Sequence, residues 1–398
     1  MTSIAQHVQR AFLETPFHNR AVDHCVVNDW YTWKGYTVVN TFEDVEFEYF
    51  AIRNSASVFD LSPMSKYRIH GRDAEAFLNR LVYRDSSQLA VGRVAYAVWC
   101  NDRGKVVDDG TIFRLGKEDF RLCAQERQLD WLMLSASGFD VDIVEETRDV
   151  AALSLQGPTS AAVLKAMGLQ GVEALKPFAL VTLPFETGQI MVSRTGFTGD
   201  LGYELWIDPA LAERLWDRVF AAGEPYNIRA IGARALEIAR IEAGFIQAGV
   251  DFLPAPLTIR NDHDRSPFEL DLGWLVDFKK PHFTGRRALA AEKNNGSQFR
   301  LVKLDVEGNK VARDSFIYLD RGKTQVGTVT SAVWSPITKA NIAFATVEEK
   351  KVKHAGTLWA EIYFQRELRW HKKWARCTVV ERPFWDPKRR RATPPADC

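Results

Sequence analysis

Two stretches of the chain arrange apolar and polar residues in the same order. Residues 67–82, YRIHGRDAEAFLNRLV, have the pattern of a short strand, a glycine turn and an amphipathic helix, and residues 153–168, LSLQGPTSAAVLKAMG, repeat that order. The two stretches align Gly71 with Gly157 and place apolar residues at equivalent helical positions. This weak self-similarity predicts two related α+β subdomains that face each other.

Two further helices are expected between this repeat and the C-terminal part of the chain. The segment DPALAERLWDRVFAAG predicts a helix with Asp208 as its N-cap, Pro209 in its first turn and Gly223 at its end. The apolar spacing of GARALEIARIEAG predicts another helix over 232–244.

The pattern changes near residue 299, where short β-rich runs alternate with turn residues. Such runs predict a separate β-sandwich or β-barrel. We therefore divide the chain into an α+β region over 1–290 and a β-rich region over 291–398. The last residues, DPKRRRATPPADC, are basic and rich in proline, and we expect them to form a frayed tail.

The charge balance and the absence of long apolar runs exclude some functions. The 398 residues are enough for two or three domains. With 52 basic and 51 acidic residues the formal charge is +1, which favours neither nucleic acid nor an anionic membrane as a partner. No apolar run approaches the ~20 residues that span a bilayer. The sequence predicts no oligomeric state.

The N-terminus and the cysteines indicate a compartment. The first residues, MTSIAQHVQRAFLETPF, lack the basic region and apolar core of a secretory signal. The five cysteines are odd in number and widely scattered, which is not a disulfide framework and suits a reducing environment. We therefore expect a cytoplasmic protein.

Motifs for several common kinds of site are missing. The sequence has no GxxxxGK[ST] loop, no GxGxxG after a strand, no HExxH and no CxxC pair. The histidines are dispersed, and His24 beside Cys25 lacks a second pair of ligands. We expect no metal site.

Residues 93–125 have the pattern of a β-hairpin that carries two adjacent acids. One strand ends near Trp99, a turn follows at 101–104, and the second strand contains Asp108 and Asp109. Aspartate is a poor strand former, and because strand side chains alternate, one of the two must face inward. A buried carboxylate is costly unless it is paired, so the acids are either structural or part of a site. These residues alone leave both interpretations open.

A second unusual acid lies in RTGFTGDLGYELWI, residues 194–207. Glycines interrupt an otherwise strand-like run, and Glu204 has apolar neighbours. By itself this pattern predicts a bulged strand with a hydrogen-bonded acid.

Six segments, taken together and in order, resemble the folate-dependent aminomethyltransferase family, whose type is the glycine-cleavage T-protein. They run from about residue 57 to 347 and keep near-family spacing. VFDLSPMSKYRIHG resembles the FDVSHM segment, NDRGKVVDDGTIFRL the DD stretch, and TGFTGDLGYE the TGYTGE-x-GYE motif. IGARALEIARIEAG resembles GARD-x-LRLEAG, SPFELDLGWLVDF resembles SPLE-x-x-x-GW, and GTVTSAVWSPITKANIAFATV resembles the VTSG segment.

The resemblance implies an α+β fold in which two related subdomains and a C-terminal β-barrel or sandwich form a ring around tetrahydrofolate. It implies that Asp109 is the catalytic aspartate, lying near N5 of the folate. A glutamate can accept the N–H row of a pterin, an arginine suits the glutamyl carboxylates, and aromatic or thioether side chains form the walls of a pocket. The cofactor-binding positions implied in this way are Glu204, Arg234, Trp274, Tyr96, Met64, Gln125 and Phe197.

Departures from the family pattern gather on one side of the implied site. Phe197 replaces the tyrosine of TGYTGE, Gln125 replaces an asparagine, and Pro63 replaces the histidine of VSHM. The entry segment G-W-x-x-P is replaced by WYTWKGYTVV, residues 30–39. A T-protein receives its aminomethyl group on this side, so a kept folate pocket with a rebuilt donor side favours another donor.

We therefore predict a tetrahydrofolate-dependent demethylase that moves a methyl group from a small S-, N- or O-methylated substrate to N5 of tetrahydrofolate. Asp109 would orient the folate and handle the N5 proton. A sulfonium or ammonium donor needs a cage for its charge, and Trp30, Trp33 and Trp99 are candidates. A methoxyaromatic donor leaves as phenolate and needs an acid or a cation, for which Tyr31, Tyr36 and Lys34 are candidates.

Two other functions stay open. The first is the glycine-cleavage aminomethyltransferase itself, against which the departures at Pro63, Gln125 and Phe197 count. The second is a non-catalytic folate-binding module, which on this fold carries a cysteine motif where this chain reads IEAGFIQAGVDF. The sequence does not show whether a partner oxidase or a carrier protein is needed.

Overall fold

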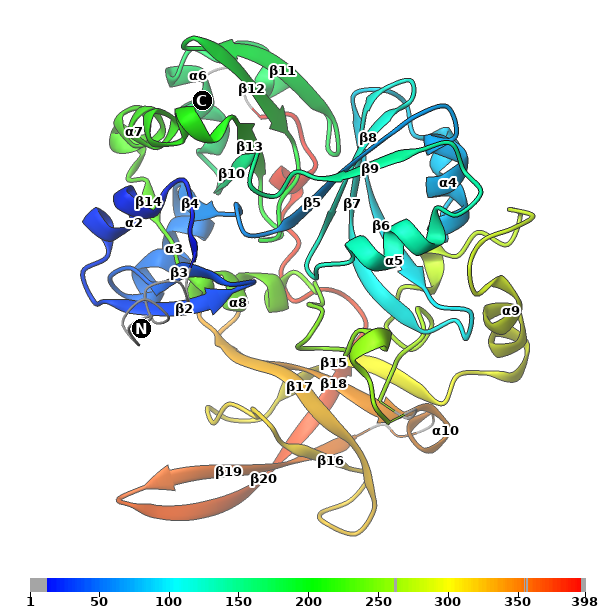
Figure 1. The fold of residues 1–398 in the computed structure, drawn as a ribbon. Helices are drawn as coiled ribbons and strands as arrows, with labels where there is room; N and C mark the ends of the chain where they lie inside the picture. Colours follow the sequence, from blue (N-terminus) through cyan, green and yellow to red (C-terminus); the bar gives the residue numbers. More distant parts are fainter. Residues whose placement is uncertain (1–12, 261–262, 354, 356, 395–398) are drawn as a thin grey trace, which may run out of the picture.

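Two α+β subdomains, a small N-terminal sheet and a β-barrel surround a common centre (Figure 1). This arrangement comes from a computed structural model, which describes residues 13–260, 263–353, 355 and 357–394. The α+β class, the paired subdomains and the barrel are as the sequence predicts.

The first subdomain is a five-stranded antiparallel sheet with the order β6-β7-β8-β5-β9. Helices α4 and α5 cover one face and bury a core of aromatic and aliphatic side chains. The elements are β5 Ser65–His70, α4 Ala74–Leu81, β6 Arg93–Cys100, β7 Val106–Gly116, β8 Asp119–Ala124, α5 Leu129–Ser135 and β9 Asp142–Glu145. The predicted hairpin is therefore β6 and β7, and both acids lie in β7.

The second subdomain is a six-stranded sheet with the order β11-β12-β13-β10-β4-β14. Only the β4–β14 pair is parallel, and α6 and α7 pack on the buried face. The elements are β4 Ser57–Asp60, β10 Ala151–Gln156, α6 Ser160–Ala166, β11 Leu180–Phe185, β12 Gly188–Ser193, β13 Gly202–Ile207, α7 Ala212–Gly223 and β14 Arg229–Ala230. As predicted, Asp208 accepts a hydrogen bond from the backbone of Ala210 at the start of the helical segment.

The same strand–glycine–helix unit occurs in both subdomains. Gly71 and Gly157 lie between β5 and α4 and between β10 and α6, with φ of +131° and +120°. A Cβ atom at Gly71 would lie 2.6 Å from the carbonyl oxygen of Asp140, and one at Gly157 would lie 2.4 Å from that of Ser55. Neither turn has room for a side chain, so glycine is required twice. The predicted repeat is confirmed.

The N-terminal sheet has the order β1-β3-β2 and lies beside the second subdomain. Asp44 caps α3 by accepting hydrogen bonds from the backbone N–H groups of Glu46 and Phe47. The elements here are β1 Leu13–Glu14, α2 His18–His24, β2 Asp29–Trp33, β3 Tyr36–Thr41 and α3 Val45–Asn54, and α8 Ala233–Glu242 packs on α3.

The C-terminal part is a closed six-stranded barrel, not a sandwich, with the order β15-β18-β17-β16-β19-β20. Closure removes most sheet edges, and the interior is filled by small and branched side chains. The elements are α9 Arg286–Asn295, β15 Phe299–Val306, β16 Phe316–Tyr318, β17 Gln325–Ser335, β18 Ala340–Glu348, α10 Glu349–Val352, β19 Leu358–Arg366 and β20 Arg369–Val380.

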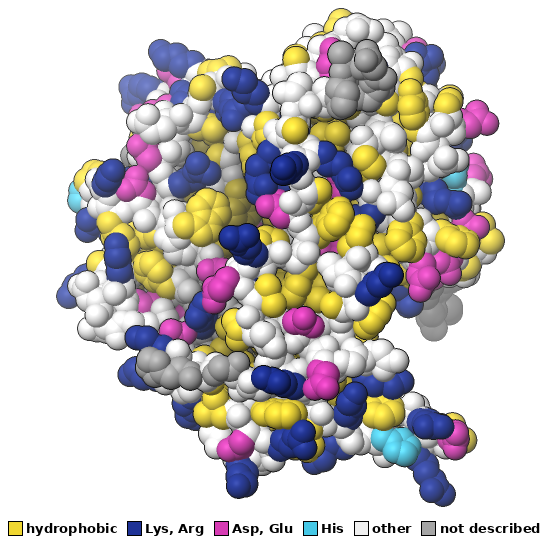
Figure 2. All heavy atoms as spheres, turned by 180° about the vertical axis from the view of Figure 1, so that it is seen from behind, with side chains coloured by type: hydrophobic (Ala, Val, Ile, Leu, Met, Phe, Trp, Pro, Cys, Tyr) yellow, Lys and Arg dark blue, Asp and Glu magenta, His cyan; other side chains and the backbone are white. Residues whose placement is uncertain are grey.

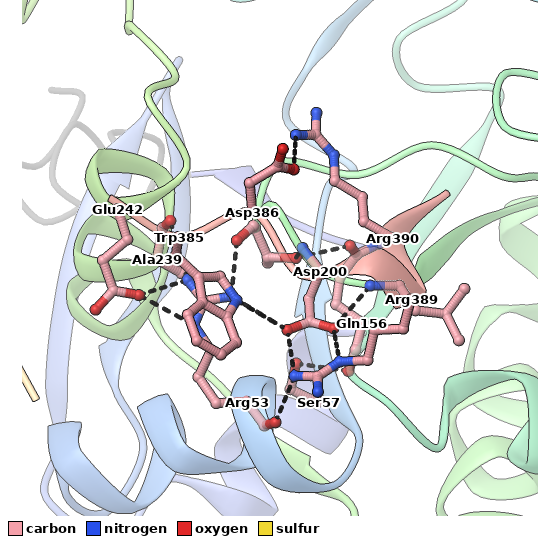
Figure 3. A network of polar contacts seen from close by, with 12 residues as sticks. Arg53, Ser57, Gln156, Asp200, Ala239, Glu242, Trp385, Asp386, Arg389 and Arg390 are labelled. Carbon is pink, nitrogen blue, oxygen red and sulfur yellow. Dashed lines mark hydrogen bonds and ion pairs between the residues drawn. The ribbon is translucent and has the colours of Figure 1, made fainter. Parts of the chain in front are cut away.

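After the barrel, the chain returns to the centre of the molecule and docks there (Figure 3). Arg389 donates two hydrogen bonds to Asp200, at 2.6 and 2.8 Å, and Trp385 donates one to the same carboxylate at 3.3 Å. The buried Arg53 lies 3.6 Å from Asp200 and donates to Glu242 of α8 at 2.6 Å. The expectation of a frayed tail is therefore wrong for residues 386–392, because Arg389 pairs with the buried Asp200 and Arg194 donates to the backbone carbonyl of Ala392. Residues 395–398 of the expected tail lie outside the described residues.

Candidate functional site

The register of β6 and β7 puts the two adjacent acids on opposite faces of the first sheet. Asp109 lies opposite Val98, on the same face as Tyr96, whereas Asp108 lies opposite Trp99. Asp108 is fully buried and accepts hydrogen bonds at 2.9 Å from the backbone N–H groups of Asp109 and Glu126. Burial raises the pKa of Asp108 well above its usual range. Asp108 therefore holds the loop after β8 in place.

Asp109 is half-buried and has one phenol partner. The hydroxyl of Tyr96 donates to Oδ2 of Asp109 at 2.7 Å. Burial raises the pKa of Asp109 to about 6; the Tyr96 hydrogen bond lowers it and the charge of Asp251 raises it. A carboxyl with a pKa this close to neutrality can both accept and release a proton.

A buried network beneath Asp109 joins α8 to the barrel. Asp251 is 2% exposed and accepts hydrogen bonds from Arg240 at 2.5 Å and from the hydroxyls of Thr330 and Ser331 at 2.8 and 2.6 Å. A register shift in β17 between Val329 and Ser331 lets two successive hydroxyls reach the same carboxylate. Sequence reasoning missed this network because its members come from three distant segments.

Glu204 lies in β13 of the second sheet, opposite Ser193 and Ser154. The hydroxyl of Thr195 donates to its Oε2 at 2.5 Å. Burial raises the pKa of Glu204 to about 7, and the hydroxyls of Thr195 and Ser193 lower it. Glu204 is thus an isolated acid among neutral donors.

The faces that carry the two acids pack against each other. Phe113 is four residues after Asp109 in β7, and Trp206 is two residues after Glu204 in β13. Because strand side chains alternate, each aromatic residue lies on the same face as its acid. The two rings meet edge to face, with centroids 5.0 Å apart. Asp109 and Glu204 therefore belong to facing surfaces of the two subdomains, and this inter-subdomain region is the candidate site.

Apolar side chains from several elements line this region. Met64 and Trp33 pack on the hydrophobic cluster between the subdomains. Phe197 stacks on Phe245, with centroids 5.5 Å apart and the planes 18° from parallel. The structure thus places Met64 against the cluster between the subdomains, and the roles of Met64 and Phe197 in binding folate stay predictions.

The predicted cage of three tryptophans does not form. Trp99 is 0% exposed in the core of the first subdomain, since its pairing with Asp108 puts it on the face opposite Asp109. Trp30 packs on the core of the second subdomain and on His18, at 5.4 Å between centroids. Strand alternation in β2 puts Trp33 and Tyr31 on the other face from Trp30. The assignment of Trp99 to the substrate is wrong.

Three other predicted cofactor positions lie apart from the two acids. Arg234 is in the first turn of α8, its side chain is 59% exposed, and it forms an ion pair with Asp29 at 3.4 Å. Trp274 is 70% exposed. Gln125 is half-buried in the loop after β8. Contacts within the described part of the chain do not join these residues to Asp109 or Glu204, and their roles stay predictions.

Two lysines lie near the site, and of the two only Lys34 is singled out from the sequence, as a candidate acid or cation. Lys66 is 0% exposed and donates to the backbone carbonyls of Ser62 and Met64, at 2.8 and 3.0 Å. Burial lowers its pKa to about 8. Lys34, at the tip of the β2–β3 hairpin, forms an ion pair with Glu126, whose backbone binds Asp108. Both lysines fix the loops that border the site, and neither sequence neighbourhood signals this.

Metal-ligating clusters and membrane-spanning helices are both absent from the described ranges. Over residues 13–260 and the other described ranges, no three His, Cys, Asp or Glu side chains group closely enough to hold a metal ion. Every helix in those ranges is too short or too polar to cross a membrane.

Comparison with known families agrees with this geometry. Residues 18–280 match the family described as "GCVT N-terminal domain", and residues 300–386 match "Glycine cleavage T-protein C-terminal barrel domain". The chain belongs to the glycine cleavage T-protein family. Aminomethyltransferases of this family are enzymes that transfer a one-carbon unit.

Individual relatives differ in name and in length. The chain is 34% identical over 395 residues to a trimethylamine-oxide aldolase of Ruegeria pomeroyi, covering 95% of this chain and 48% of that protein. The chain therefore spans about half the length of that relative. It is 30% identical over 357 residues to an aminomethyltransferase of Bacillus subtilis, covering 88% of this chain and 93% of that protein.

A solved structure shows the same fold. The glycine cleavage system aminomethyltransferase T of Bartonella henselae matches with a TM-score of 0.82, over 94% of this chain and 98% of that chain. The identity is 23%, so this likeness concerns the fold alone.

Proposed function

We propose that this protein is a tetrahydrofolate-dependent methyltransferase that removes a methyl group from a small S-, N- or O-methylated substrate. The observation that carries the proposal is the pair of acids, Asp109 and Glu204, on facing surfaces of the two subdomains. Their raised pKa values and different partners suit two tasks, one for proton handling and one for binding.

The residues around the acids fit tetrahydrofolate in their chemistry. Glu204 is a half-buried acceptor for the N–H donors along the edge of a pterin, and such a charge-assisted pair is strong when water is excluded. The stacked rings of Phe197 and Phe245 and the thioether of Met64 supply apolar walls. When bound, tetrahydrofolate supplies N5 as the nucleophile.

Asp109 has the properties of the proton acceptor in this reaction. As the new carbon–nitrogen bond forms and the bond from the methyl carbon to its heteroatom breaks, Asp109 takes the proton that leaves the nucleophile. Tyr96 holds one oxygen of the carboxylate in a fixed position through its 2.7 Å hydrogen bond. The backbone amide of Asp109 is itself fixed by Asp108, so the carboxylate has little freedom to move.

The donor side of the site carries aromatic side chains of β2. Trp33 lies beside Phe59, at 6.1 Å between centroids, and Tyr31 shares its strand face. A cationic methylated amine binds well to such rings, and one relative is named for trimethylamine oxide, which carries N-methyl groups. These points support an N-methylated donor among the three classes.

The test is an assay with tetrahydrofolate and a panel of sulfonium, ammonium, amine N-oxide and methoxyaromatic donors, read by mass spectrometry. We expect 5-methyl-tetrahydrofolate with one donor class, and loss of that product in Asp109→Asn. Methylene-tetrahydrofolate formed only from an aminomethyl-lipoyl carrier would replace the proposal with the aminomethyltransferase of glycine cleavage. Folate binding without any product from the panel or the carrier would indicate a binding module.

A further inference from the structure

The distal part of the β19–β20 hairpin projects from the barrel as a two-stranded arm (Figure 1). We use the name arm for residues 362–375. The outer edges of the hairpin pair with the barrel only over 359–361 of β19 and 377–380 of β20, so in the described strands the arm pairs only with itself. From residue 362 to the tip, the arm extends about 20 Å at ~3.3 Å per residue.

The arm carries exposed basic and apolar side chains toward its tip. Leu368 at the tip is 91% exposed, Trp370 is 72% exposed and Tyr363 is 55% exposed. Four basic residues lie among them, Arg366, Arg369, Lys372 and Lys373. Arg366 pairs with Glu367 and Lys372 pairs with Glu361, so Arg369 and Lys373 are the charges on which the test below depends. Figure 2 shows the basic side chains crowding the projecting end at the lower right.

Protection of a free sheet edge explains only part of this surface. Lysine and arginine on an edge strand prevent unwanted pairing with other strands. Leucine and tryptophan at the tip have the opposite effect, because exposed apolar groups promote association. An isolated two-stranded ribbon is also marginally stable in water, so a partner would stabilise the arm.

The same chain exposes a second surface of complementary chemistry at α2, α3 and the loop between α2 and β2, which we name the acidic face. Its apolar side chains are Val22, Val26, Val27, Phe47 and Phe50, which are between 37% and 77% exposed. Its exposed acids are Asp23, Glu43, Asp44 and Glu46. The backbone N–H groups of Val26 and Val27 bond to Phe42, which joins the loop to the start of α3. Arg229 forms an ion pair with Glu43, and Asp23 interacts electrostatically with Arg20. Asp44 accepts hydrogen bonds from two backbone N–H groups. Within the described ranges Asp23, Asp44 and Glu46 form no ion pair as close as that of Glu43.

We propose that the arm of one copy docks on the acidic face of a second copy, and that two such contacts form a symmetric dimer. Basic groups of the arm meet acids, and its tip residues Leu368 and Trp370 meet exposed valines and phenylalanines. Figure 1 places the arm and the α2–α3 region on the same side of the molecule, so one two-fold axis can serve both contacts. The inference is independent of the reaction that the site performs.

The test measures mass by sedimentation velocity and light scattering at low and high salt. The wild-type protein is expected at twice the 45.2 kDa of one chain at low salt, with dissociation as salt rises. The arm-reversed variant Arg369→Glu/Lys373→Glu and the face-reversed variant Asp23→Lys/Glu46→Lys are each expected to be monomeric. The matched control Lys350→Glu/Lys353→Glu, which changes charge by the same amount near α10, is expected to stay dimeric.

Mixing the two reversed variants gives the decisive result. In a mixed pair, one contact joins a reversed arm to a reversed face and the other joins two unchanged surfaces, so both are attractive and the dimer should return. A wild-type protein that stays at 45.2 kDa at every concentration would overturn the proposal, as would a dimer that both reversals leave intact. A monomer whose arm binds a single-stranded oligonucleotide would assign the arm to nucleic acid instead.

Discussion

The two subdomains share the order of four strands, β6-β7-β8-β5 in the first and β11-β12-β13-β10 in the second, together with a strand–glycine–helix unit. They nevertheless place their acids in different settings. In the first sheet, Asp109 has a phenol partner and two further acids nearby, Asp108 and Asp251. In the second sheet, Glu204 is surrounded by the hydroxyls of Thr195 and Ser193. The first setting tunes a carboxyl group for proton transfer, and the second prepares a carboxylate to accept hydrogen bonds.

The repeat makes this difference visible at equivalent positions. Ser154 lies three residues before Gly157 and pairs with Glu204, whereas Arg68 lies three residues before Gly71 and pairs with Arg121. Strands β13 and β8 are equivalent, and at the same position β13 carries the acid Glu204 whereas β8 carries the base Arg121. The backbone repeat provides two similar surfaces, and side-chain substitution alone makes the site between them asymmetric.

The largest effect is expected from Asp109→Asn, which removes the proton acceptor and keeps the shape. We expect kcat to fall by about 10²–10⁴-fold, the usual contribution of a positioned general base, with little change in KM for tetrahydrofolate. Steady-state kinetics with the donor found in the panel provides the measurement. A variant that keeps kcat and loses only affinity would move Asp109 to a binding role.

Glu204→Gln should produce the opposite kinetic pattern. The variant loses a charge-assisted acceptor worth about 1.5–3 kcal/mol, so KM for tetrahydrofolate should rise by about 10- to 100-fold while kcat changes less. Quenching of tryptophan fluorescence by the folate gives an independent dissociation constant. Equal losses of kcat in Asp109→Asn and Glu204→Gln would contradict the proposal that Asp109 transfers the proton and Glu204 binds the folate.

The two repeat glycines test whether the subdomains are equivalent in stability. Gly71→Ala and Gly157→Ala each introduce a Cβ atom within 2.6 Å of a backbone oxygen at positive φ. We expect each to lower the free energy of unfolding by about 2 kcal/mol or more. Urea denaturation followed by circular dichroism measures this, with Gly168→Ala as a control, since that turn is also at positive φ but has open space around it. A loss in the control as large as in the other two would show that the backbone angle matters more than the contact.

Tyr96→Phe should produce the smallest effect, a shift in pH dependence. The pKa of Asp109 is raised to about 6, so activity that needs the carboxylate is expected to fall as pH drops through that value. Removal of the Tyr96 hydroxyl takes away the bond that lowers this pKa, so the acid limb of kcat/KM should move to higher pH. An unchanged limb would show that another group sets it.

The sequence was enough to predict the helices and strands and to single out the acids Asp109 and Glu204. It was not enough to predict which side chains share a sheet face with these acids. Alternation showed that Asp108 and Asp109 point in opposite directions, yet only the register of β6 and β7 decides that Trp99 shares the face of Asp108. The sequence therefore predicts a substrate-binding role for Trp99, whereas the structure buries Trp99 in the core of the first subdomain. Register depends on the turn and on the packing of both faces, which a single strand pattern does not contain.

The sequence pattern also does not predict side-chain contacts between segments that are far apart in the chain. The carboxylate of Asp251 accepts hydrogen bonds from Arg240 of α8 and from two hydroxyl groups at a bulge in the barrel. The segment after the barrel is basic and rich in proline, a composition that predicts a tail. Its docking depends on the ion pair of Arg389 with Asp200, which is 189 residues away in sequence.

That docked segment also gives the molecule an order of assembly. Residues 385–392 are made after every element that they tie together, so Arg53, Asp200 and Glu242 leave the ribosome well before Arg389 can join them. During synthesis the two subdomains can therefore form their own cores while the centre between them is still open to water. Synthesis of residues 385–392 then acts as a late checkpoint, because the centre can close only after this segment has been made.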